Sequence, residues 1–593
     1  MQKVFFFLTA LLLSVTTFSQ INYTLRMPKP QNHYFEVEME IQGISDKTVE
    51  IKMPVWAPGS YLVRDFSKNV NLVKAFNEKG ESLVVEKTTK NTWKINKGSA
   101  QKIKVNYEVY AFELTVRTSF LDLTHGFVSG TGIFMYVEKL KNKAGKLNVV
   151  PHANFKTITT ALPKSSDGTI GDGGTTFSYS DYDQLADCPI EIGNQEVFTF
   201  QSKGVNHTVA MYGEGNYDIN QLKVDMAKIT AASTEVFGQN PNKEYVFIVH
   251  NVTDSQGGLE HVNSTTLSVN RWGYSPDKYN RFLTLVAHEY FHLWNVKRMR
   301  AIELGPFNYD SETYTSLLWV MEGFTSYYED LIMYRAGFLT KEEYLATLSK
   351  TLNYVEGSEG SRVQPVAHAS FDAWIKAYKP NENSANTTMS YYSRGGLVAA
   401  VMDAKIVAKF KGKKSLDGFL QLLYQEFFVK LDRGFSAQEF EKMFSKYMEE
   451  DMADFFKKYV YDTQIPNYEA LFAPLGITVE NNNKELISFG AAFGMADGLV
   501  TVKAIRSKSA AEEAGLSVGD EVIGFNGYRM NVTLLNEMIA ALDVNQEFNL
   551  LVSRDLQLLE LKPKMGTYSK RGYTMKFSSD FEKSKEGKFF LRR

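Results

Sequence analysis

Two histidines four residues apart form the pattern in this chain that most directly predicts chemistry. They stand in His288-Glu289-Tyr290-Phe291-His292. Residues four apart lie on one face of an α-helix, so both imidazoles can bind a single ion, with Glu289 beside them. Two histidines at this spacing are typical of a zinc site. The string therefore predicts a helix that binds zinc.

A third ligand is needed, because a catalytic zinc ion takes three protein ligands and keeps one position open for water. Glu322 meets this need, because it is the single acid inside an apolar run that starts at Leu317 and continues to Phe324. A carboxylate buried there without a partner would be costly. We therefore predict one zinc ion per chain, bound by His288, His292 and Glu322.

The helix that carries the two histidines is expected to begin near Pro276. Ser275 can cap its first turn, and proline is favoured at the first helical position. Apolar residues then recur at helical spacing at Phe282, Leu285, Val286 and Phe291. Farther along, Glu329 lies seven residues after Glu322, on the same helical face. It is expected either to orient a ligand histidine or to lie on the surface as a solvated carboxylate.

Two weaker patterns flank the histidine helix. Gly257-Gly258-Leu259-Glu260-His261 precedes it, and its glycines would let the backbone approach a ligand closely. The alternative is an ordinary loop with a solvated Glu260. Ser390-Tyr391-Tyr392-Ser393-Arg394-Gly395-Gly396 follows the helix and precedes an apolar helical run. One of its two tyrosine hydroxyls is predicted to face the zinc site.

Length and composition describe a folded protein of several domains. With 593 residues the chain is too long for one hydrophobic core, and three or four domains are expected. The formal net charge is -2 and no polybasic stretch occurs, so nucleic acid is not an expected partner. Cys188 is the only cysteine, which excludes an intramolecular disulfide. Its side chain is expected to be buried and inert.

Residues 1–20 differ from the rest of the chain. Lys3 is followed by an apolar run, Val4–Leu13, and then by mostly small or polar residues up to Gln20. This order is typical of a signal peptide cleaved near Ser19 or Gln20. The apolar run is too short to span a bilayer comfortably, and no later segment approaches membrane-spanning length. We expect an exported protein without a transmembrane segment after signal removal, located in the periplasm or, alternatively, outside the cell.

The remaining chain divides into three parts. Residues 21–180 are predicted to be rich in strands, because in stretches such as His33–Ile41 apolar residues alternate with acids. Within this part Pro54–Tyr61 is predicted to be a structural turn, because turn chemistry accounts for its prolines and glycine. Residues 181–465 combine short strands with long helical patterns, and residues 466–593 return to strands around a small separate module. The predicted fold class is multidomain α+β.

Four longer strings carry a family resemblance: Pro54–Asp65, Tyr107–Phe112, Asp187–Gly193 and, most specific of all, His288–Arg298. They resemble the glycyl aminopeptidase family, exported gluzincin metallopeptidases with a PDZ domain. The resemblance implies an enzyme that removes small N-terminal residues, such as glycine or alanine, from peptides with a free N-terminus. It also implies three domains: a β-rich N-terminal domain (21–180), a thermolysin-like catalytic domain with a helical lobe (181–465), and a PDZ domain with a C-terminal tail (466–593).

The resemblance further implies the roles of the central residues. His288, His292 and Glu322 are similar to the zinc ligands of the family, and Glu289 is similar to its general base. Because the match extends through the residues around this helix, it is more specific than the histidine spacing alone.

The two flanking patterns gain roles by the same resemblance. The stretch with Gly257, Gly258 and Glu260 is similar to a strand that binds the substrate's free amine in the broader gluzincin aminopeptidases. Tyr392 is similar to the tyrosine that steadies the oxyanion in those enzymes, and Tyr391 is the competing choice.

Two features depart from the family pattern. The stretch between His292 and Glu322 is longer than is usual in the broader aminopeptidases, which predicts an inserted loop beside the site. Phe489–Phe493 stands in the place of the carboxylate-binding loop of a PDZ domain, but it lacks the usual Gly-Leu-Gly-Phe string. A peptide C-terminus is nevertheless the expected partner of that domain.

Two other functions fit parts of the same sequence. A zinc endopeptidase of the cell envelope would use the same ligands and base but leave the amine site open. A PDZ peptide-binding protein would retain the metal site only as a vestige. The intact ligands, base and tyrosine argue against a vestigial site.

Overall fold

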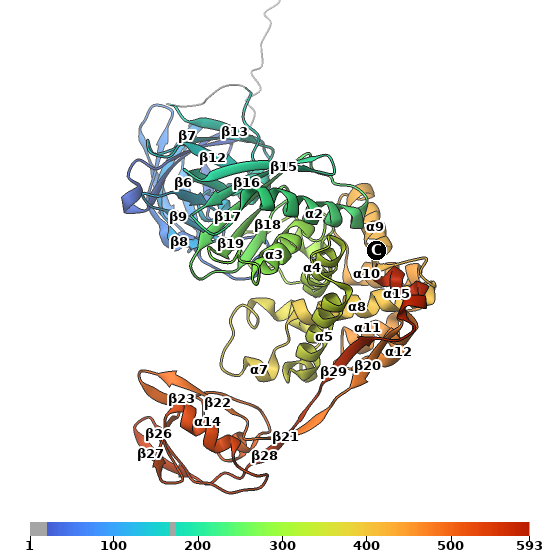
Figure 1. The fold of residues 1–593 in the computed structure, drawn as a ribbon. Helices are drawn as coiled ribbons and strands as arrows, with labels where there is room; N and C mark the ends of the chain where they lie inside the picture. Colours follow the sequence, from blue (N-terminus) through green and yellow to red (C-terminus); the bar gives the residue numbers. More distant parts are fainter. Residues whose placement is uncertain (1–19, 167–172, 592–593) are drawn as a thin grey trace, which may run out of the picture. The chain divides into compact units, whose positions relative to one another are not determined.

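The computed structural model describes residues 20–166 and 173–591 (Figure 1). All of the predicted signal peptide except Gln20 lies outside the described residues. The chain forms two compact units. The first comprises the chain up to Ser60, Arg64–Glu196 and Tyr309–Ser311, and the second comprises Tyr61–Val63, Val197–Asn308 and Glu312–Arg593. Within the described ranges, no helix is long and apolar enough to cross a membrane.

The first unit is built on a nine-stranded sheet in the order β13-β11-β1-β2-β7-β4-β5-β6-β3. Its strands are β1 (Gln20–Arg26), β2 (Tyr34–Gln42), β3 (Thr48–Lys52), β4 (Val70–Asn77), β5 (Ser82–Lys87), β6 (Thr92–Asn96), β7 (Lys102–Tyr110), β11 (Gly145–Val150) and β13 (Thr175–Tyr179). In β2 the residues Phe35, Val37, Met39 and Ile41 are all buried, whereas the intervening glutamates lie on the other face. The alternation predicted for this stretch is therefore confirmed.

A second sheet of the same unit has the order β12-β14-β10-β9-β8. It consists of β8 (Phe112–Thr115), β9 (Thr118–Leu121), β10 (Gly126–Val128), β12 (Thr157–Thr160) and β14 (Ile190–Gly193). Because β14 pairs with β10 and β12, the first unit extends beyond residue 180, where the domain boundary was expected. Cys188 precedes β14 and is buried, as expected.

The second unit begins with a five-stranded sheet in the order β15-β16-β17-β19-β18. Its strands are β15 (Glu196–Ser202), β16 (Val205–Tyr212), β17 (Glu244–Val252), β18 (Gly257–Glu260) and β19 (Ser264–Asn270). Strands β16, β17 and β19 are parallel, whereas β18 runs antiparallel to β19 at the edge. Helix α2 (Ile219–Phe237) packs against α3 (Tyr279–Phe291), and α3 also contacts β18 and β19. The stretch Gly257–Glu260 is thus an edge strand and not a loop.

Helices complete this part of the chain, as the apolar spacing predicted. They include α4 (Phe324–Arg335), α5 (Lys341–Gly357), α7 (Ser384–Thr387), α8 (Tyr391–Lys409), α9 (Leu416–Leu423), α10 (Ala437–Met448) and α11 (Ala453–Tyr459). The start predicted near Pro276 is wrong, because α3 begins at Tyr279. The Ser275 hydroxyl donates to Asp277 Oδ1 at 2.6 Å and does not cap a helix.

The C-terminal residues form a small module, and two strand pairs connect it to the rest of the second unit (Figure 1). Strands β20 (Ile477–Asn481) and β21 (Lys484–Ser488) pair with β29 (Tyr573–Phe577) and β28 (Gly566–Lys570), respectively. The module has the sheet order β22-β23-β24-β26-β27, from β22 (Ala491–Ala496), β23 (Leu499–Ile505), β24 (Glu521–Phe525), β26 (Leu550–Arg554) and β27 (Gln557–Leu561), with β25 (Tyr528–Arg529) beside β24. Helix α14 (Val532–Ala540) packs on its core, and α15 (Lys585–Leu591) returns to contact α8.

Candidate metal centre and active site

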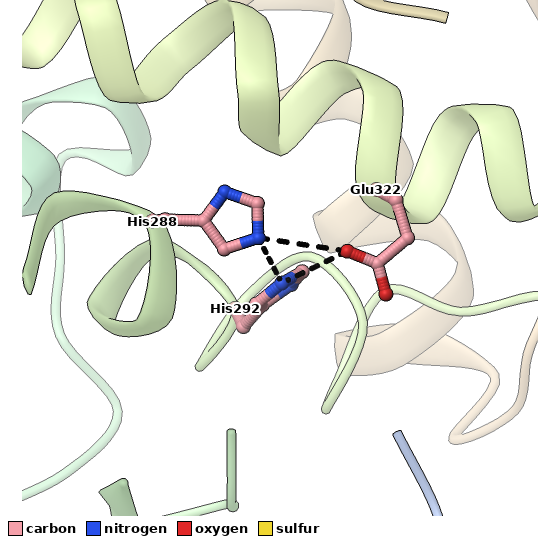
Figure 2. Close-up of side chains that lie close together, drawn as sticks. All are labelled: His288, His292 and Glu322. Atoms are coloured by element: carbon pink, nitrogen blue, oxygen red, sulfur yellow. Dashed lines mark hydrogen bonds and ion pairs between the residues drawn. The ribbon is translucent and has the colours of Figure 1, made fainter. Parts of the chain in front are cut away.

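Three side chains that are distant in sequence converge in the second unit. His288 lies near the end of α3, and His292 is the residue that caps that helix. Their Nε2 atoms are 3.1 Å apart, and Glu322 Oε2 lies 3.6 Å from the first and 3.2 Å from the second. Figure 2 shows both rings directed at the same carboxylate oxygen. Two imidazoles and one carboxylate that present single donor atoms to one point fit a zinc ion.

The far side of each imidazole is fixed by a hydrogen bond. His288 Nδ1 pairs with Glu329 Oε2, and His292 Nδ1 lies 2.6 Å from the carbonyl oxygen of Asn295. With a proton on each Nδ1, both Nε2 atoms keep a lone pair for a metal. Glu329 therefore orients the ring of His288, a predicted zinc ligand, and this was one of its two expected roles.

Asn295 has a structural role that sequence reasoning missed. Its Nδ2 donates to the carbonyl oxygens of Val320 at 3.0 Å and Met321 at 2.9 Å, immediately before Glu322. The same residue thus fixes the ring of His292 and the turn that carries Glu322. Asn295 lies in the family-like string His288–Arg298, which could have drawn attention to it. The string alone, however, does not show what its amide contacts.

Glu322 stands in a π-helical turn, Trp319–Gly323, that leads into α4. Such turns are common at functional sites because they reposition one side chain within a helix. A Cβ on Gly323 would lie 2.4 Å from Gly395 Cα, and a Cβ on Gly395 would lie 2.5 Å from the Trp319 carbonyl oxygen. The two glycines therefore let α8 lie directly against the turn, which brings the tyrosines at the start of α8 close to Glu322.

The charges of the three side chains are strongly coupled. Burial alone would lower the pKa of both imidazoles, but the carboxylates of Glu329 and Glu322 outweigh it and raise the pKa of His288 well above its ordinary value. The pKa of His292 is raised as well, mainly by Glu322 against the effect of burial. Burial would raise the pKa of Glu322, but the two imidazoles hold it at about 2. The metal-free centre thus retains protons on nitrogen that a metal must displace.

We expect zinc binding to weaken steeply as the pH falls. Because the pKa values of His288 and His292 are raised, their imidazoles stay protonated to a higher pH than free histidine, and each bound zinc ion must release up to two protons. Zinc affinity should be measured by chelator competition between about pH 6 and about pH 8, across the normal titration range of histidine. An affinity that stays constant over this range would contradict the protonated metal-free state.

A second group of side chains adjoins the first. Glu260, Glu289 and His292 each contribute one possible ligand atom, and these three atoms lie within 4.8 Å of one another. Glu260 is 4% exposed and Glu289 is 5% exposed, and neither Glu260 Oε1 nor Glu289 Oε2 has a hydrogen-bond partner among the described residues. Burial raises the pKa of Glu289 to about 7, and Glu260 contributes to the rise. Buried carboxylate oxygens without partners indicate that a polar ligand belongs there.

Strand β18 approaches Glu289 as closely as a backbone can. A Cβ on Gly258 would lie 2.3 Å from Glu289 Cδ, whereas a Cβ on Gly257 would meet no atom within 4 Å. Contact with Glu289 therefore requires glycine at the second position of the pair, whereas Gly257 has a φ of +159°, a backbone conformation that favours glycine. This contact places Glu260, two residues further along β18, at the same cluster as Glu289.

The two tyrosines at the start of α8 both lie at the centre. The ring of Tyr392 is 6.3 Å from that of His288, and the ring of Tyr391 is stacked 4.7 Å from that of Tyr392. Burial raises the pKa of both hydroxyls, and the carboxylate of Glu322 raises them further. Tyr392 is thus the tyrosine next to the ring of His288, and it is also the one that the family resemblance favours.

Tyr61 is a site residue that was assigned only a structural role. Pro54–Tyr61 does contain a turn, in which Ser60 N donates to the Ala57 carbonyl oxygen at 3.0 Å. The side chain of Tyr61, however, belongs to the second unit and is 2% exposed. Burial is the largest cause of the raised pKa of its hydroxyl, and the negative charges of Glu322 and Glu260 raise that pKa further. Tyr61 is therefore close enough to both carboxylates for their charges to act on its hydroxyl, and the turn interpretation was incomplete.

Tyr61 also forms part of an aromatic cluster. Its ring lies 5.7 Å from that of Trp374 and 6.1 Å from that of Tyr378, in edge-to-face arrangements. Tyr378 is also close enough to Tyr391 and Tyr392 to raise the pKa of their hydroxyls. Nothing in the local sequence around Trp374 pairs it with a residue that precedes it by hundreds of positions, so this cluster could be seen only in three dimensions.

Two family models match the chain. The Peptidase M61 N-terminal domain matches residues 22–194, and the M61 glycyl aminopeptidase model matches residues 281–398. Over these two segments the chain is similar to M61 peptidases. The second M61 match includes His288, His292, Glu322 and both tyrosines, whereas Glu260 precedes it. No curated protein matches the chain.

Solved structures agree with the M61 matches. An aminopeptidase N family protein from Idiomarina loihiensis has a TM-score of 0.87 and 28% sequence identity, covering 97% of this chain and 100% of that chain. An M1 zinc metallopeptidase from Deinococcus radiodurans has a TM-score of 0.50 and 13% identity, covering 76% of this chain and 95% of that chain. The second likeness is one of fold alone. Together they confirm a β-rich N-terminal part followed by a part with the fold of an M1 metallopeptidase.

Proposed function

We propose that this protein is a zinc-dependent aminopeptidase that removes small N-terminal residues, such as glycine or alanine, from peptides. The observation that carries the proposal is the pair of buried, unpartnered carboxylate oxygens of Glu260 and Glu289 beside three convergent metal-ligand atoms. The M61 glycyl aminopeptidase match supports it, as does the likeness to the aminopeptidase N family protein. His288, His292 and Glu322 would hold one zinc ion.

The chemistry divides between the ion and Glu289. When bound, zinc would activate a water molecule and polarise the scissile carbonyl group. Glu289 accepts the proton of the attacking water and then donates it to the leaving amine. A raised pKa suits a residue that must first take up a proton and then release it near neutral pH.

Glu260 is proposed to bind the protonated α-amine of the substrate. Glu260 lies close to the proposed metal ligands, because one of its carboxylate oxygens is within 4.8 Å of a ring nitrogen of His292. An amine held there leaves space for only one residue before the scissile bond, which would make the enzyme an exopeptidase. An endopeptidase with the same metal centre would gain nothing from a buried, unpartnered carboxylate at this place.

Blocking the substrate's amine is expected to lower kcat/KM at least about tenfold, because an acetylated substrate leaves the charge of Glu260 buried and unpaired. Glu260→Gln should shrink this preference while zinc content stays normal. The measurement compares free and acetylated peptides of one sequence with both enzymes. Glu244→Gln, an exposed change in the same sheet, is the matched control. If wild-type enzyme cleaves both peptides equally well, the endopeptidase alternative replaces the present proposal.

Tyr392 is proposed to donate a hydrogen bond to the oxyanion of the tetrahedral intermediate. Tyr392→Phe is then expected to lower kcat about a hundredfold, the usual cost of losing one oxyanion donor, with KM nearly unchanged. Tyr391→Phe is the matched control, because this neighbour loses the same atom one position away. Steady-state kinetics of both variants decide the assignment. A silent Tyr392→Phe beside an impaired Tyr391→Phe would transfer the role to Tyr391.

The aromatic cluster of Tyr61, Trp374 and Tyr378 supports the preference for small residues. The charges of Glu260 and Glu322 act on the Tyr61 hydroxyl, and Trp374 and Tyr378 pack against the Tyr61 ring. We expect these rings to limit the volume available to the side chain of the first substrate residue. Glycyl and alanyl amides should therefore be hydrolysed with higher kcat/KM than leucyl amides. A higher kcat/KM for the leucyl amide would show that the aromatic cluster does not restrict the first substrate residue to small side chains.

Two further assignments belong to the same proposal. Residues 1–20 are proposed to be a signal peptide that directs the enzyme to the periplasm, and N-terminal sequencing of protein from fractionated cells would test this. The C-terminal module is proposed to be a PDZ domain, because α14 packs on the core of a small antiparallel sheet with β22 at its edge. A peptide C-terminus is its proposed ligand.

A further inference from the structure

A cavity of about 1010 Å³ lies in the second unit, beside the start of α8. Tyr391 and Tyr392 form part of its wall, and residues of the C-terminal module form another part. Tyr392 borders both the cavity and the metal centre, because its ring lies 6.3 Å from that of His288. Ligand sites in proteins usually have volumes of roughly 300 to 1,000 Å³, so this space suffices for a short peptide.

The two parts of the wall are joined by hydrogen bonds. The buried side chain of Asn386 donates from Nδ2 to the Ile505 carbonyl oxygen at 2.8 Å and accepts from Ser507 N at 3.0 Å. Tyr568 OH donates to the Gly357 carbonyl oxygen at 3.2 Å. These bonds tie α7 and the end of α5 to the module on either side of the cavity. The cavity is therefore a built feature and not a gap between unconnected parts.

The module contributes backbone that can pair with a peptide. Ala491 and Ala492, the first residues of β22, lie in the cavity wall. Strand β22 is the edge strand of its sheet and pairs with β23 on one side only within the described residues. An extended peptide can add to such an edge through main-chain hydrogen bonds. The small alanine side chains leave room for it.

The charge of the wall favours an anionic group. Arg506 and Lys570 both line the cavity. The Arg506 guanidinium is held in place, because it stacks 3.8 Å from the centre of the Tyr568 ring and donates to Ser488 Oγ at 2.7 Å. The acid in the wall, Glu359, is paired with an arginine at 3.3 Å and so is neutralised. Two cations then remain to attract a carboxylate.

We propose that this cavity binds the C-terminal part of a short peptide substrate, with the substrate's α-carboxylate at Arg506 and Lys570. The N-terminal residue of the same peptide would extend past Tyr392 to the metal ligands. The inference rests on the proposed aminopeptidase function and specifies its substrates as oligopeptides with both ends free. Since an extended chain advances about 3.3 Å per residue, only peptides above a minimum length would reach both ends of the cavity.

The test uses peptides in which an N-terminal glycine is followed by two to eight alanines. Each peptide is prepared once with a free and once with an amidated C-terminus. Glycyl p-nitroanilide has no α-carboxylate for Arg506 to bind and therefore reports the activity of the metal centre alone. With wild-type enzyme, kcat/KM for the longer free-acid peptides is expected to exceed that for the amides about tenfold, the usual scale of a charge-assisted hydrogen bond.

Variants of the two cations identify the site. Lys570→Ala and Arg506→Gln should each reduce the free-acid preference, while glycyl p-nitroanilide is hydrolysed at the wild-type rate, which also shows that the variants fold. Lys576→Ala removes an exposed cation from β29 outside the cavity and should change neither value. If kcat/KM is equal for the free-acid and amidated peptides while anilide hydrolysis is normal, the inference about the cavity is overturned but the proposed aminopeptidase function is not. Zinc-loaded enzyme that does not hydrolyse the anilide would instead contradict the proposed function on which it rests.

Discussion

Glu289→Gln is expected to lower kcat by about two to four orders of magnitude, the range associated with loss of a positioned general base. Glutamine has the same shape as glutamate, so β18 can still lie against it through Gly258. Its amide, however, cannot accept a proton from water. Because Glu289 is not among the three predicted ligands, zinc content should remain at one per chain.

The measurement pairs steady-state kinetics on a glycyl amide with elemental analysis of the same sample. Glu342→Gln, an exposed change at the start of α5, is the control for the loss of one carboxylate and should be fully active. Near-normal turnover of Glu289→Gln would show that another group is the base. Loss of zinc from that variant would instead place Glu289 among the ligands.

His288→Ala is expected to abolish stable zinc binding and, with it, hydrolysis. Two remaining ligands cannot hold a catalytic zinc ion well, and the change also leaves Glu329 without the imidazole it pairs with. Elemental analysis after dialysis against a chelator measures the loss. His368→Ala, which changes an exposed histidine of α6 (Val366–Phe371), should retain one zinc ion. Stoichiometric zinc in His288→Ala would remove this residue from the site.

The sequence was sufficient wherever chemistry depends on local spacing. A histidine four residues from another must share its helix face, so His288 and His292 meet in the structure as predicted. An acid alone in an apolar run must find a partner, and Glu322 meets the two imidazoles. Similarly, strict alternation in β2 predicted which side chains are buried.

Features that depend on distant residues could not be predicted. Tyr61 follows a turn that prolines explain, so nothing local connects its ring with Trp374 or with Glu260. The π-helical turn at Trp319–Gly323 has no periodic signature in the sequence, and it lies where Gly395 of another helix approaches it closely. The start of α3 was misplaced because Ser275 bonds within its own loop.

With one zinc ion at this site, the enzyme is proposed to remove one residue at a time from a free N-terminus. Metal-free enzyme should be titrated with zinc while the products from an unblocked peptide are identified by mass spectrometry. Activity is predicted to rise to a plateau at one zinc ion per chain, with the free N-terminal amino acid and the peptide shortened by one residue as the first products. Fragments from internal bonds, or full activity before zinc is added, would contradict the account.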